Sequence, residues 1–420
     1  MSASTLSNMR KHFLLLQGVC SPFFDRLGER LRAAGHAVTK VNFTVGDSVY
    51  WRQGNTYVYR GQAKDIPEFL CGIWERHGIT DQVVFGDRRP VHRRAILAAR
   101  RRGIRNHVFE EGYFRPYWVT LEREGVNAHS LLPRDPDWYR EAGKRLRSVG
   151  RPQAFPNQFH TRARHDVLYH LAGAANPFLH PHYRNHALVT APAEYAGFLL
   201  RKLRQPHWKR RDNERLQTLM ESRRPLYLLP LQLKSDAQIR YHSDYKNMQE
   251  VIGKVAASFA YHAPSDAFLV IKNHPLDMGL AQYARLIKVL THEYDLDDRL
   301  VYLEGGNLEA LLKRASGLVT VNSTAGNVAL GFGCPTHTLA SPIYDMPGLT
   351  HQGTLDDFWH NTPTPDAELF RAYRRTVART VQINGGFYCR PGIDLAAENA
   401  LQALQRERSP LKQLMDEIAS

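Results

Sequence analysis

Apolar and polar positions along the chain repeat in one order: an apolar strand, a polar turn and an amphipathic helix. Residues 12–42 form the first such unit, in which Phe24, Leu27 and Leu31 fall on one face of the expected helix. A unit of about 30 residues with this order is the building block of a parallel, doubly wound sheet. In the N-terminal part we expect strands at 12–17, 37–42, 82–85 and 106–109, and helices at 24–34 and 92–102.

A second series of the same kind begins at Pro225. It predicts strands at 226–230, 267–271, 300–303, 317–321 and 336–339, and helices at 248–260, 283–292, 308–315 and 327–332. The chain is also too long for one compact domain. The predicted fold class is therefore α/β, with two Rossmann-like domains and a ligand cleft between them. The expected segments are a first domain at 1–165, a basic helical connector at 166–222, a second domain at 223–375 and C-terminal helices at 376–420.

Composition restricts the class of protein. With 43% hydrophobic and 23% charged residues the chain is typical of globular proteins, and no apolar run approaches the roughly 20 residues of a membrane span. The apolar start at 13–20 is too short and too interrupted for a signal peptide, so we expect a buried strand there. Four scattered cysteines without a CxxC pair predict reduced thiols in a cytoplasmic protein, with neither a disulfide scaffold nor a zinc site.

The formal net charge of +15 implies anionic partners, such as nucleic acid, an acidic membrane surface or phosphorylated substrates. Part of this charge lies at 196–211, where Pro206 is expected to split a helical pattern that mixes leucines with basic residues. The stretch is either a basic helix between domains or a segment that contacts anionic lipid or a lipid-linked acceptor. No nucleic-acid module accompanies it, so we expect no nucleic-acid partner. Its cations are Arg201, Lys202, Arg204, Lys209, Arg210 and Arg211.

Carboxylates follow two strands of the predicted N-terminal sheet. Asp87 comes after the strand at 82–85, and Glu110 and Glu111 come after the strand at 106–109, with aromatic residues close in sequence. Functional groups of open α/β sheets lie just past the carboxyl ends of the strands. Aromatic surroundings would raise the pKa of one carboxylate and suit it to general acid/base chemistry. The alternatives are a solvent-exposed acidic pair and, for Asp87, a structural cap.

The second series carries polar residues that suit a phosphate. Lys272, Asn273 and His274 follow one strand, and Pro275 stops that strand. Another strand ends in 322–324, Asn-Ser-Thr, just before a helix, where a hydroxyl and loop amides can bind an anion. An ordinary capped turn is the alternative for each motif alone. Taken together they predict a phosphate site.

Four motifs stand in a characteristic order: EEGY at 110–113, PLQLKSDAQI at 230–239, KNHP at 272–275 and NSTAG at 322–326. With these motifs the chain resembles capsule polysaccharide biosynthesis and export proteins, in particular KpsS-type β-Kdo transferases. The resemblance implies a GT-B-like glycosyltransferase that is retaining and uses neither a metal nor a cofactor. The implied donor is CMP-Kdo (Kdo is 3-deoxy-D-manno-oct-2-ulosonic acid). The implied acceptor is a phosphatidylglycerol-type lipid, or its first Kdo, at the inner face of the cytoplasmic membrane.

Roles for single residues follow from this resemblance. Glu111, or its neighbour Glu110, would act as general acid/base, and Asp236 would be the nucleophile. The first domain would serve the acceptor and the second the nucleotide sugar. His274 would bind the CMP phosphate and assist its departure. The residues expected to bind the nucleotide sugar are Gln232, Gln238, Lys272, Asn273, His274, Pro275, Glu304, Asn322, Ser323 and Thr324.

Two other functions remain open at this stage. A GT-B transferase that uses another nucleotide sugar would place similar motifs at similar positions. A non-catalytic capsule assembly or export factor could instead dock on a membrane or on partner proteins through its basic surface. Nucleotide binding separates these possibilities, because the export factor would not require it.

Overall fold

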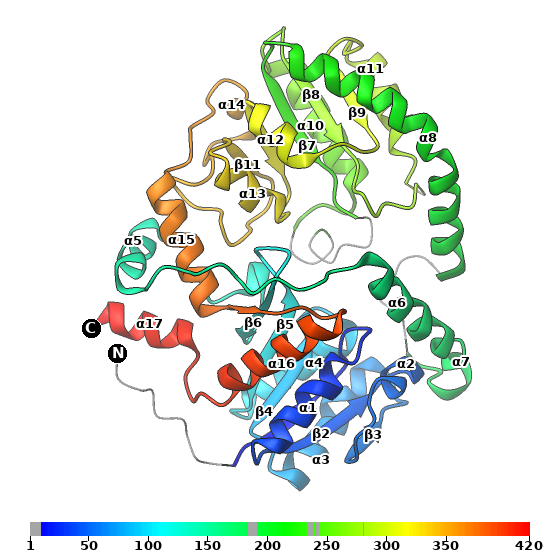
Figure 1. Cartoon of the computed structure of the whole chain (residues 1–420), viewed down its shortest axis with the longest axis vertical. Coiled ribbons are helices and arrows are strands. Elements are labelled where there is room, and N and C mark those ends of the chain that lie inside the picture. Colours follow the sequence, from blue (N-terminus) through cyan, green and yellow to red (C-terminus); the bar gives the residue numbers. More distant parts are fainter. Residues whose placement is uncertain (1–9, 184–190, 234–238, 240–242, 280) are drawn as a thin grey trace. The chain divides into compact units, whose positions relative to one another are not determined.

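The computed structural model describes residues 10–183, 191–233, 239, 243–279 and 281–420. The chain divides into two compact units (Figure 1). The first unit combines Met1–Leu132, Glu141–His186 and Arg374–Ser420, and the second combines Pro133–Arg140 and Ala187–Tyr373. These divisions differ from those expected from the sequence, since the C-terminal residues join the first unit rather than forming a separate segment.

The first unit contains a seven-stranded sheet in the order β12-β6-β5-β4-β1-β2-β3. Its five strands from β5 to β3 are parallel, whereas β6 runs antiparallel to β5 and β12 antiparallel to β6. The strands are β1 (His12–Leu15), β2 (Ala37–Asn42), β3 (Thr56–Val58), β4 (Asp81–Phe85), β5 (Arg105–Glu111), β6 (Trp118–Arg123) and β12 (Gln382–Asn384).

Alternate residues of β1 explain why both faces of this sheet are covered. Phe13 and Leu15 belong to one core, whereas Leu14, together with Leu16 directly after β1, belongs to a core on the opposite face. The first core also contains residues of the C-terminal helix α16, which packs on α1. The helices of the first unit are α1 (Phe23–Ala33), α2 (Val45–Val49), α3 (Ile66–His77), α4 (Pro90–Arg101), α6 (Phe159–Gly173), α7 (Asn176–Leu179), α16 (Arg390–Leu404) and α17 (Pro410–Ala419).

The second unit contains a five-stranded sheet, entirely parallel, in the order β11-β10-β7-β8-β9. Tyr227 and Leu229 of β7 join a core with α10, and Leu226 and Leu228 join a core with α12. The strands are β7 (Leu226–Pro230), β8 (Phe268–Lys272), β9 (Leu300–Leu303), β10 (Gly317–Thr320) and β11 (Thr336–Thr338). The helices are α8 (Ala191–Glu221), α10 (Met248–His262), α11 (Tyr283–Glu293), α12 (Leu308–Arg314), α13 (Ala325–Gly331) and α14 (Leu355–Phe358).

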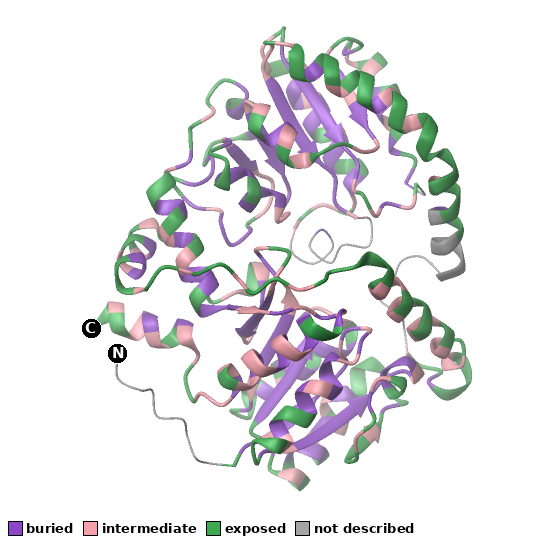
Figure 2. Ribbon diagram, in the orientation of Figure 1, coloured by how far each residue is buried: buried purple, intermediate pink, exposed green. Residues whose placement is uncertain are grey.

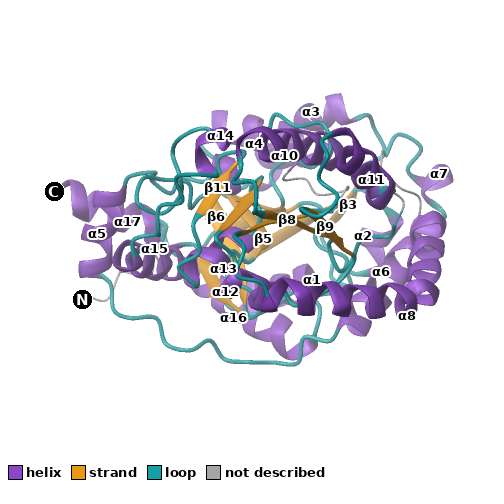
Figure 3. Ribbon diagram, turned by 90° about the horizontal axis from the view of Figure 1, so that it is seen from above, coloured by secondary structure: helices purple, strands orange, loops and turns teal. Residues whose placement is uncertain are grey.

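Burial follows this layered arrangement. Strand residues of both sheets are largely buried, while the outer faces of the helices are exposed (Figure 2). Helices lie around the strands (Figure 3). Two further helices contain residues of both units, α5 (Pro136–Arg145) and α15 (Ala367–Thr380). The α/β class with two Rossmann-like sheets is therefore confirmed.

Two expectations about elements are wrong. Glu110 and Glu111 do not follow β5 but lie within it, because the antiparallel strand β6 pairs Thr120 with Glu110 and Val119 with Glu111. Pro206 does not split the basic helical pattern, since α8 continues from Ala191 to Glu221. Proline removes one backbone donor from a helix. Side chains of α8 contact the loops after β8 and β9, as described below.

Within the described part of the chain, no helix is both long and apolar enough to cross a bilayer. The first apolar stretch forms the buried strand β1, as predicted. All four cysteines carry free thiols, of which Cys334 and Cys389 are buried.

Candidate functional site

The carboxyl ends of neighbouring strands bring the predicted polar residues of the second unit to one edge of its sheet. Gln232 follows β7, His274 follows β8, Glu304 follows β9, and Asn322 and Ser323 follow β10. In a parallel sheet these ends lie side by side. The structure thus brings together residues that are far apart in sequence, as their positions after the strands predict. Gln232 and Ser323, for example, are 91 positions apart.

The imidazole of His274 has a defined tautomer. The backbone amide of Leu276 donates to its Nδ1 at 3.1 Å, so the neutral ring carries its proton on Nε2. The amide of His274 donates to Oδ1 of Asn273 at 2.8 Å. Pro275 lies in a turn closed by a hydrogen bond from the Asp277 amide to the His274 carbonyl at 3.0 Å. The turn therefore holds a half-buried imidazole with its proton on Nε2.

A polar network supports this turn. Asn273 Nδ2 donates to Asp277 Oδ2 at 3.2 Å and to Glu304 Oε2 at 2.9 Å. Arg201 of α8 pairs with both carboxylates, at 3.4 Å in each case, and its Nη1 and Nη2 also donate to the carbonyls of Asp277 and Glu304. The side chain of Arg201 is only 12% exposed. Arg201 thus ties the loop after β8 to the loop after β9.

This placement corrects the sequence-based assignment of Arg201 to a membrane or acceptor surface. Arg201 is engaged in the second unit, and Arg211 pairs with the buried Asp212 at 2.9 Å. Asp212 accepts from the Gly305 amide at 2.9 Å, so α8 is bound to the end of β9 on both sides of Pro206. Lys202, Arg204, Lys209 and Arg210 are exposed. Their apolar neighbours Leu199, Leu200 and Leu203 are 61%, 53% and 71% exposed.

The side chain of Lys272 contacts the backbone of the turn. Its side chain is buried, and Nζ donates to the Asn273 carbonyl at 3.3 Å. Burial, with the positive charge of Arg201 nearby, lowers the pKa of Lys272. We expected a direct phosphate donor from the sequence, whereas the structure directs this ammonium group at the loop backbone.

The loop after β10 is joined to the loop after β7. Gln232 Nε2 donates to Asn322 Oδ1 at 3.1 Å, and the Asn322 amide donates to Gln232 Oε1 at 3.4 Å. Ser323 Oγ accepts from the Ala325 amide at 3.2 Å. Thr324 is the N-cap residue of α13 but makes no capping hydrogen bond with its side chain. Of the two hydroxyls expected to cap the helix, Ser323 is therefore the one that binds its first turn.

Tyr344 is a contributor that the sequence pattern did not indicate. Its hydroxyl donates to the Ser323 carbonyl at 2.6 Å. This approach requires a glycine at position 326, because a Cβ there would lie 2.2 Å from the tyrosine hydroxyl oxygen. Asp236 and Gln238, predicted as nucleophile and sugar ligand, lie outside the described residues.

The paired carboxylates of the first unit have different surroundings, since adjacent strand residues point to opposite faces. Burial, with the negative charge of Glu111 nearby, raises the pKa of Glu110 to about 7. Glu110 Oε1 accepts from the Glu111 amide at 3.0 Å. Glu111 instead lies 3.6 Å from Arg162 Nη1 and 3.5 Å from the Tyr388 hydroxyl. The carboxyl group with the raised pKa is thus Glu110, whereas the sequence interpretation preferred Glu111 as acid/base.

Asp87 has a structural partner. His129 Nδ1 lies 3.2 Å from its Oδ2, and the carboxyl group is buried. Burial raises the pKa of Asp87 and lowers the pKa of His129. This contact favours the structural alternative for Asp87.

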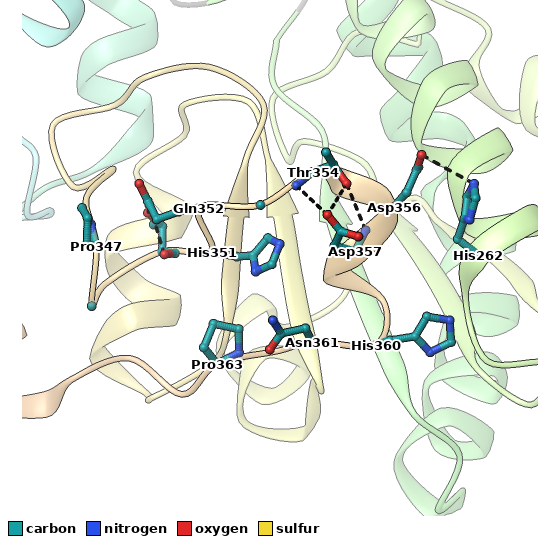
Figure 4. Close-up of a pocket in the computed structure, with 13 residues that line it drawn as sticks. His262, Pro347, His351, Gln352, Thr354, Asp356, Asp357, His360, Asn361 and Pro363 are labelled. Atoms are coloured by element: carbon teal, nitrogen blue, oxygen red, sulfur yellow. Dashed lines mark hydrogen bonds and ion pairs between the residues drawn. The ribbon is translucent and has the colours of Figure 1, made fainter.

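A cavity of about 950 Å³ in the second unit contains none of the predicted site residues. Its polar groups serve local structure: Asp356 lies 3.5 Å from His262, and Thr354 and Asp357 form a capping box at the start of α14 (Figure 4). In the ranges given above for the structure, no group of three or more histidine, cysteine, aspartate or glutamate side chains could hold a metal ion.

Fold and site together define an α/β protein with two mainly parallel sheets and polar side chains at their carboxyl edges. A model of the capsule polysaccharide biosynthesis protein family matches residues 80–388, and the chain belongs to that family.

Similar proteins come from several bacteria. The chain is 36% identical over 390 residues to the capsule polysaccharide export protein KpsS of Escherichia coli, covering 92% of this chain and 99% of that protein. It is 36% identical over 384 residues to the capsule polysaccharide modification protein LipB of Neisseria meningitidis serogroup B, covering 90% and 92%. A solved structure of Thermosulfurimonas dismutans KpsC, beta Kdo 2,7 transferase, aligns with a TM-score of 0.44 and 13% identity, covering 94% of this chain and 99% of that one.

Proposed function

We propose that this protein is a glycosyltransferase that moves β-Kdo from CMP-Kdo to a phosphatidylglycerol-type lipid, or to the first Kdo on it. The observation that carries the proposal is the His274 turn, where Nδ1 accepts from Leu276 and the proton lies on Nε2. A neutral imidazole with its proton on Nε2 can donate a hydrogen bond from Nε2 to a phosphate oxygen. Membership of the capsule polysaccharide biosynthesis family supports a capsular substrate.

The second unit would bind the donor. His274 Nε2–H would donate to the CMP phosphate, and Ser323 and Thr324 would supply hydroxyl donors to the same group. Asn322, held by Gln232, would orient the sugar or its carboxylate. As the bond between C2 of Kdo and the phosphate oxygen breaks, its electron pair stays on that oxygen as CMP. Hydrogen bonds that are already in place then stabilise the developing charge.

The first unit would activate the acceptor. The acceptor hydroxyl forms the new bond to C2 of Kdo and must lose its proton. Glu110, with a pKa of about 7, is substantially ionised at neutral pH and suits this general base role. Asp236 remains the candidate nucleophile for a retaining reaction. No metal or cofactor takes part in the proposed reaction.

The exposed part of α8 would hold the protein at the inner face of the cytoplasmic membrane. Exposed leucines beside exposed Lys202, Arg204, Lys209 and Arg210 are the composition of an interfacial helix face. Each cation near an anionic surface contributes about 1 kcal/mol. We therefore expect the K202Q/R204Q variant to bind phosphatidylglycerol vesicles roughly tenfold or more weakly at low salt. R93Q/R94Q on α4 is the matched control, and equal loss in both variants would contradict a role for α8.

Nucleotide binding tests the enzymatic proposal. A ligand at about 100 times its dissociation constant adds roughly 2.7 kcal/mol to the stability of the state that binds it. We expect CMP to raise the melting temperature more than UDP, GDP or ADP, and His274→Ala to lose the shift. A preference for UDP or GDP would mean that the donor is another nucleotide sugar and that the protein is still a transferase. The name of the E. coli relative favours a second function, capsule export without catalysis. That function would stand if no nucleotide binds and no Kdo is transferred to a lipid acceptor.

A further inference from the structure

The first unit contains a polar cavity that is lined by four arginines and differs from the cavity of the second unit described above. It has a volume of about 360 Å³ and lies beside the edge strand β12. The arginines are Arg123, Arg151, Arg379 and Arg406. Arg123 is in register with His107, which precedes Glu111 by four residues on β5. Four strand residues span about 13 Å, so this arginine lies well away from the acidic pair.

Two of the four arginines in this cavity donate to backbone carbonyls. Within the described ranges none of the four arginines forms an ion pair. Arg123 Nη2 donates to the Arg406 carbonyl at 3.1 Å, and Arg379 Nη2 donates to the Ser148 carbonyl at 2.5 Å. These contacts position two guanidinium groups but do not neutralise them.

Nearby carboxylates are engaged elsewhere. Glu122, the carboxylate that lines the cavity, accepts from Tyr113 at 2.7 Å and from Ser130. Asp81 is paired with Arg105 at 2.7 Å and with His107 at 2.7 Å. Burial lowers the pKa of Arg123, whereas the carboxylates of Asp81, Glu124 and Glu407 act in the opposite direction. Arg123 and Arg406 are half-buried, whereas Arg151 and Arg379 are exposed. An anion bound in the cavity would add negative charge beside the half-buried pair.

The remaining lining suits a small polar molecule. Gln402 offers an amide group, and Trp118 and Pro152 offer apolar surface. The volume falls at the lower end of the range of about 300–1,000 Å³ for small-molecule sites. We propose that this cavity binds an oxyanion, either the carboxylate of an acidic sugar or a phosphate group, at a site separate from the proposed donor site.

Binding of three probes tests the proposal. Inorganic phosphate, glucuronate and neutral glucose are titrated by calorimetry at low ionic strength. We expect phosphate or glucuronate to bind and glucose not to bind, and the stronger of the two identifies the source of the oxyanion. R123Q and R379Q should each weaken binding about tenfold or more, whereas R94Q, an exposed arginine on α4, should not. Binding should weaken as salt increases.

Two further measurements keep the result interpretable. His274→Ala should leave this binding intact. If that variant abolishes it, the anion occupies the donor site and the proposal is wrong. Arginine modification by p-hydroxyphenylglyoxal, read out by mass spectrometry, needs no variant. The bound anion should protect Arg123 and Arg379 and leave Arg94 reactive. Equal modification with and without the anion, or no binding by either anion, would overturn the proposal even if the nucleotide site is real.

Discussion

The amide of Leu276 donates a hydrogen bond to Nδ1 of His274, 3.1 Å away, and so decides which ring nitrogen carries the proton. Both residues belong to the short turn after β8, so the tautomer is set by local backbone geometry. A phosphate-facing histidine needs this arrangement, because an imidazole whose Nε2 lacks a proton would repel the anion. The relationship leads directly to a mutational test.

His274→Ala should strongly reduce transfer while the fold persists. The substitution removes the Nε2–H donor, and loss of one preorganised donor to developing charge costs about 10²–10³ in kcat. Its effect on stability should be about 1 kcal/mol, since the ring accepts a hydrogen bond from the Leu276 amide. Steady-state kinetics and thermal unfolding measure the two effects. His262→Ala, in the cavity of about 950 Å³ in the same unit, is the matched control and should keep full activity.

Glu110→Gln should change the pH dependence of both stability and rate. The pKa of Glu110 is raised from 4.5 to about 7, so the native state binds the proton more tightly than the unfolded chain does. Stability is then present at low pH and is lost as pH rises from about 4.5 to about 7. The variant lacks this loss, so its melting temperature should gain on the unaltered protein across that interval.

The rate gives the complementary result. If Glu110 is the general base, kcat/KM of the unaltered protein rises with pH through about 7, and Glu110→Gln removes both the rise and most of the activity. Glu111→Gln is the matched control and should keep the rise, because Glu111 is held by Arg162 and Tyr388. A pH profile lost only in Glu111→Gln would return the role to that residue.

How far the sequence predicts this molecule depends on the range of the interaction. Hydrophobic periodicity predicts the strands β1, β2, β4, β5 and β7 to β11, because buried strands and amphipathic helices leave local patterns. It does not predict β3 or β6. The pattern could not place β12, which joins the first sheet from position 382 and pairs with β6. Arg201 was misassigned for the same reason: Asp277 and Glu304, its partners, are 76 and 103 residues away. The sequence predicts that one of the two glutamates has a raised pKa. Which of them it is, Glu110, depends on the pairing of β5 with β6.

Arg201→Ala should weaken donor binding although the residue touches no reacting atom. Arg201 joins the loops that carry His274 and Glu304 through two ion pairs and two carbonyl contacts. Removing one partner from a largely buried ionic network costs about 3–5 kcal/mol. We expect a lower melting temperature and a KM for the donor raised more than kcat is lowered. Arg201→Lys should recover part of the stability, and Arg204→Ala, an exposed neighbour on α8, should change neither quantity.

Gly326→Ala should destabilise the second unit and impair its phosphate loop. A Cβ at this position would lie 2.2 Å from the Tyr344 hydroxyl, so the ring must move and its bond to the Ser323 carbonyl must break. Overpacking of this kind costs about 1–3 kcal/mol. Gly253→Ala in α10 is the matched control: nothing lies within 4 Å of its added Cβ, and the helix should gain up to about 1 kcal/mol. Thermal unfolding compares the two variants, and CMP titration reports the loop. A Gly326→Ala protein with unchanged stability and CMP affinity would mean that Tyr344 does not hold Ser323 in place.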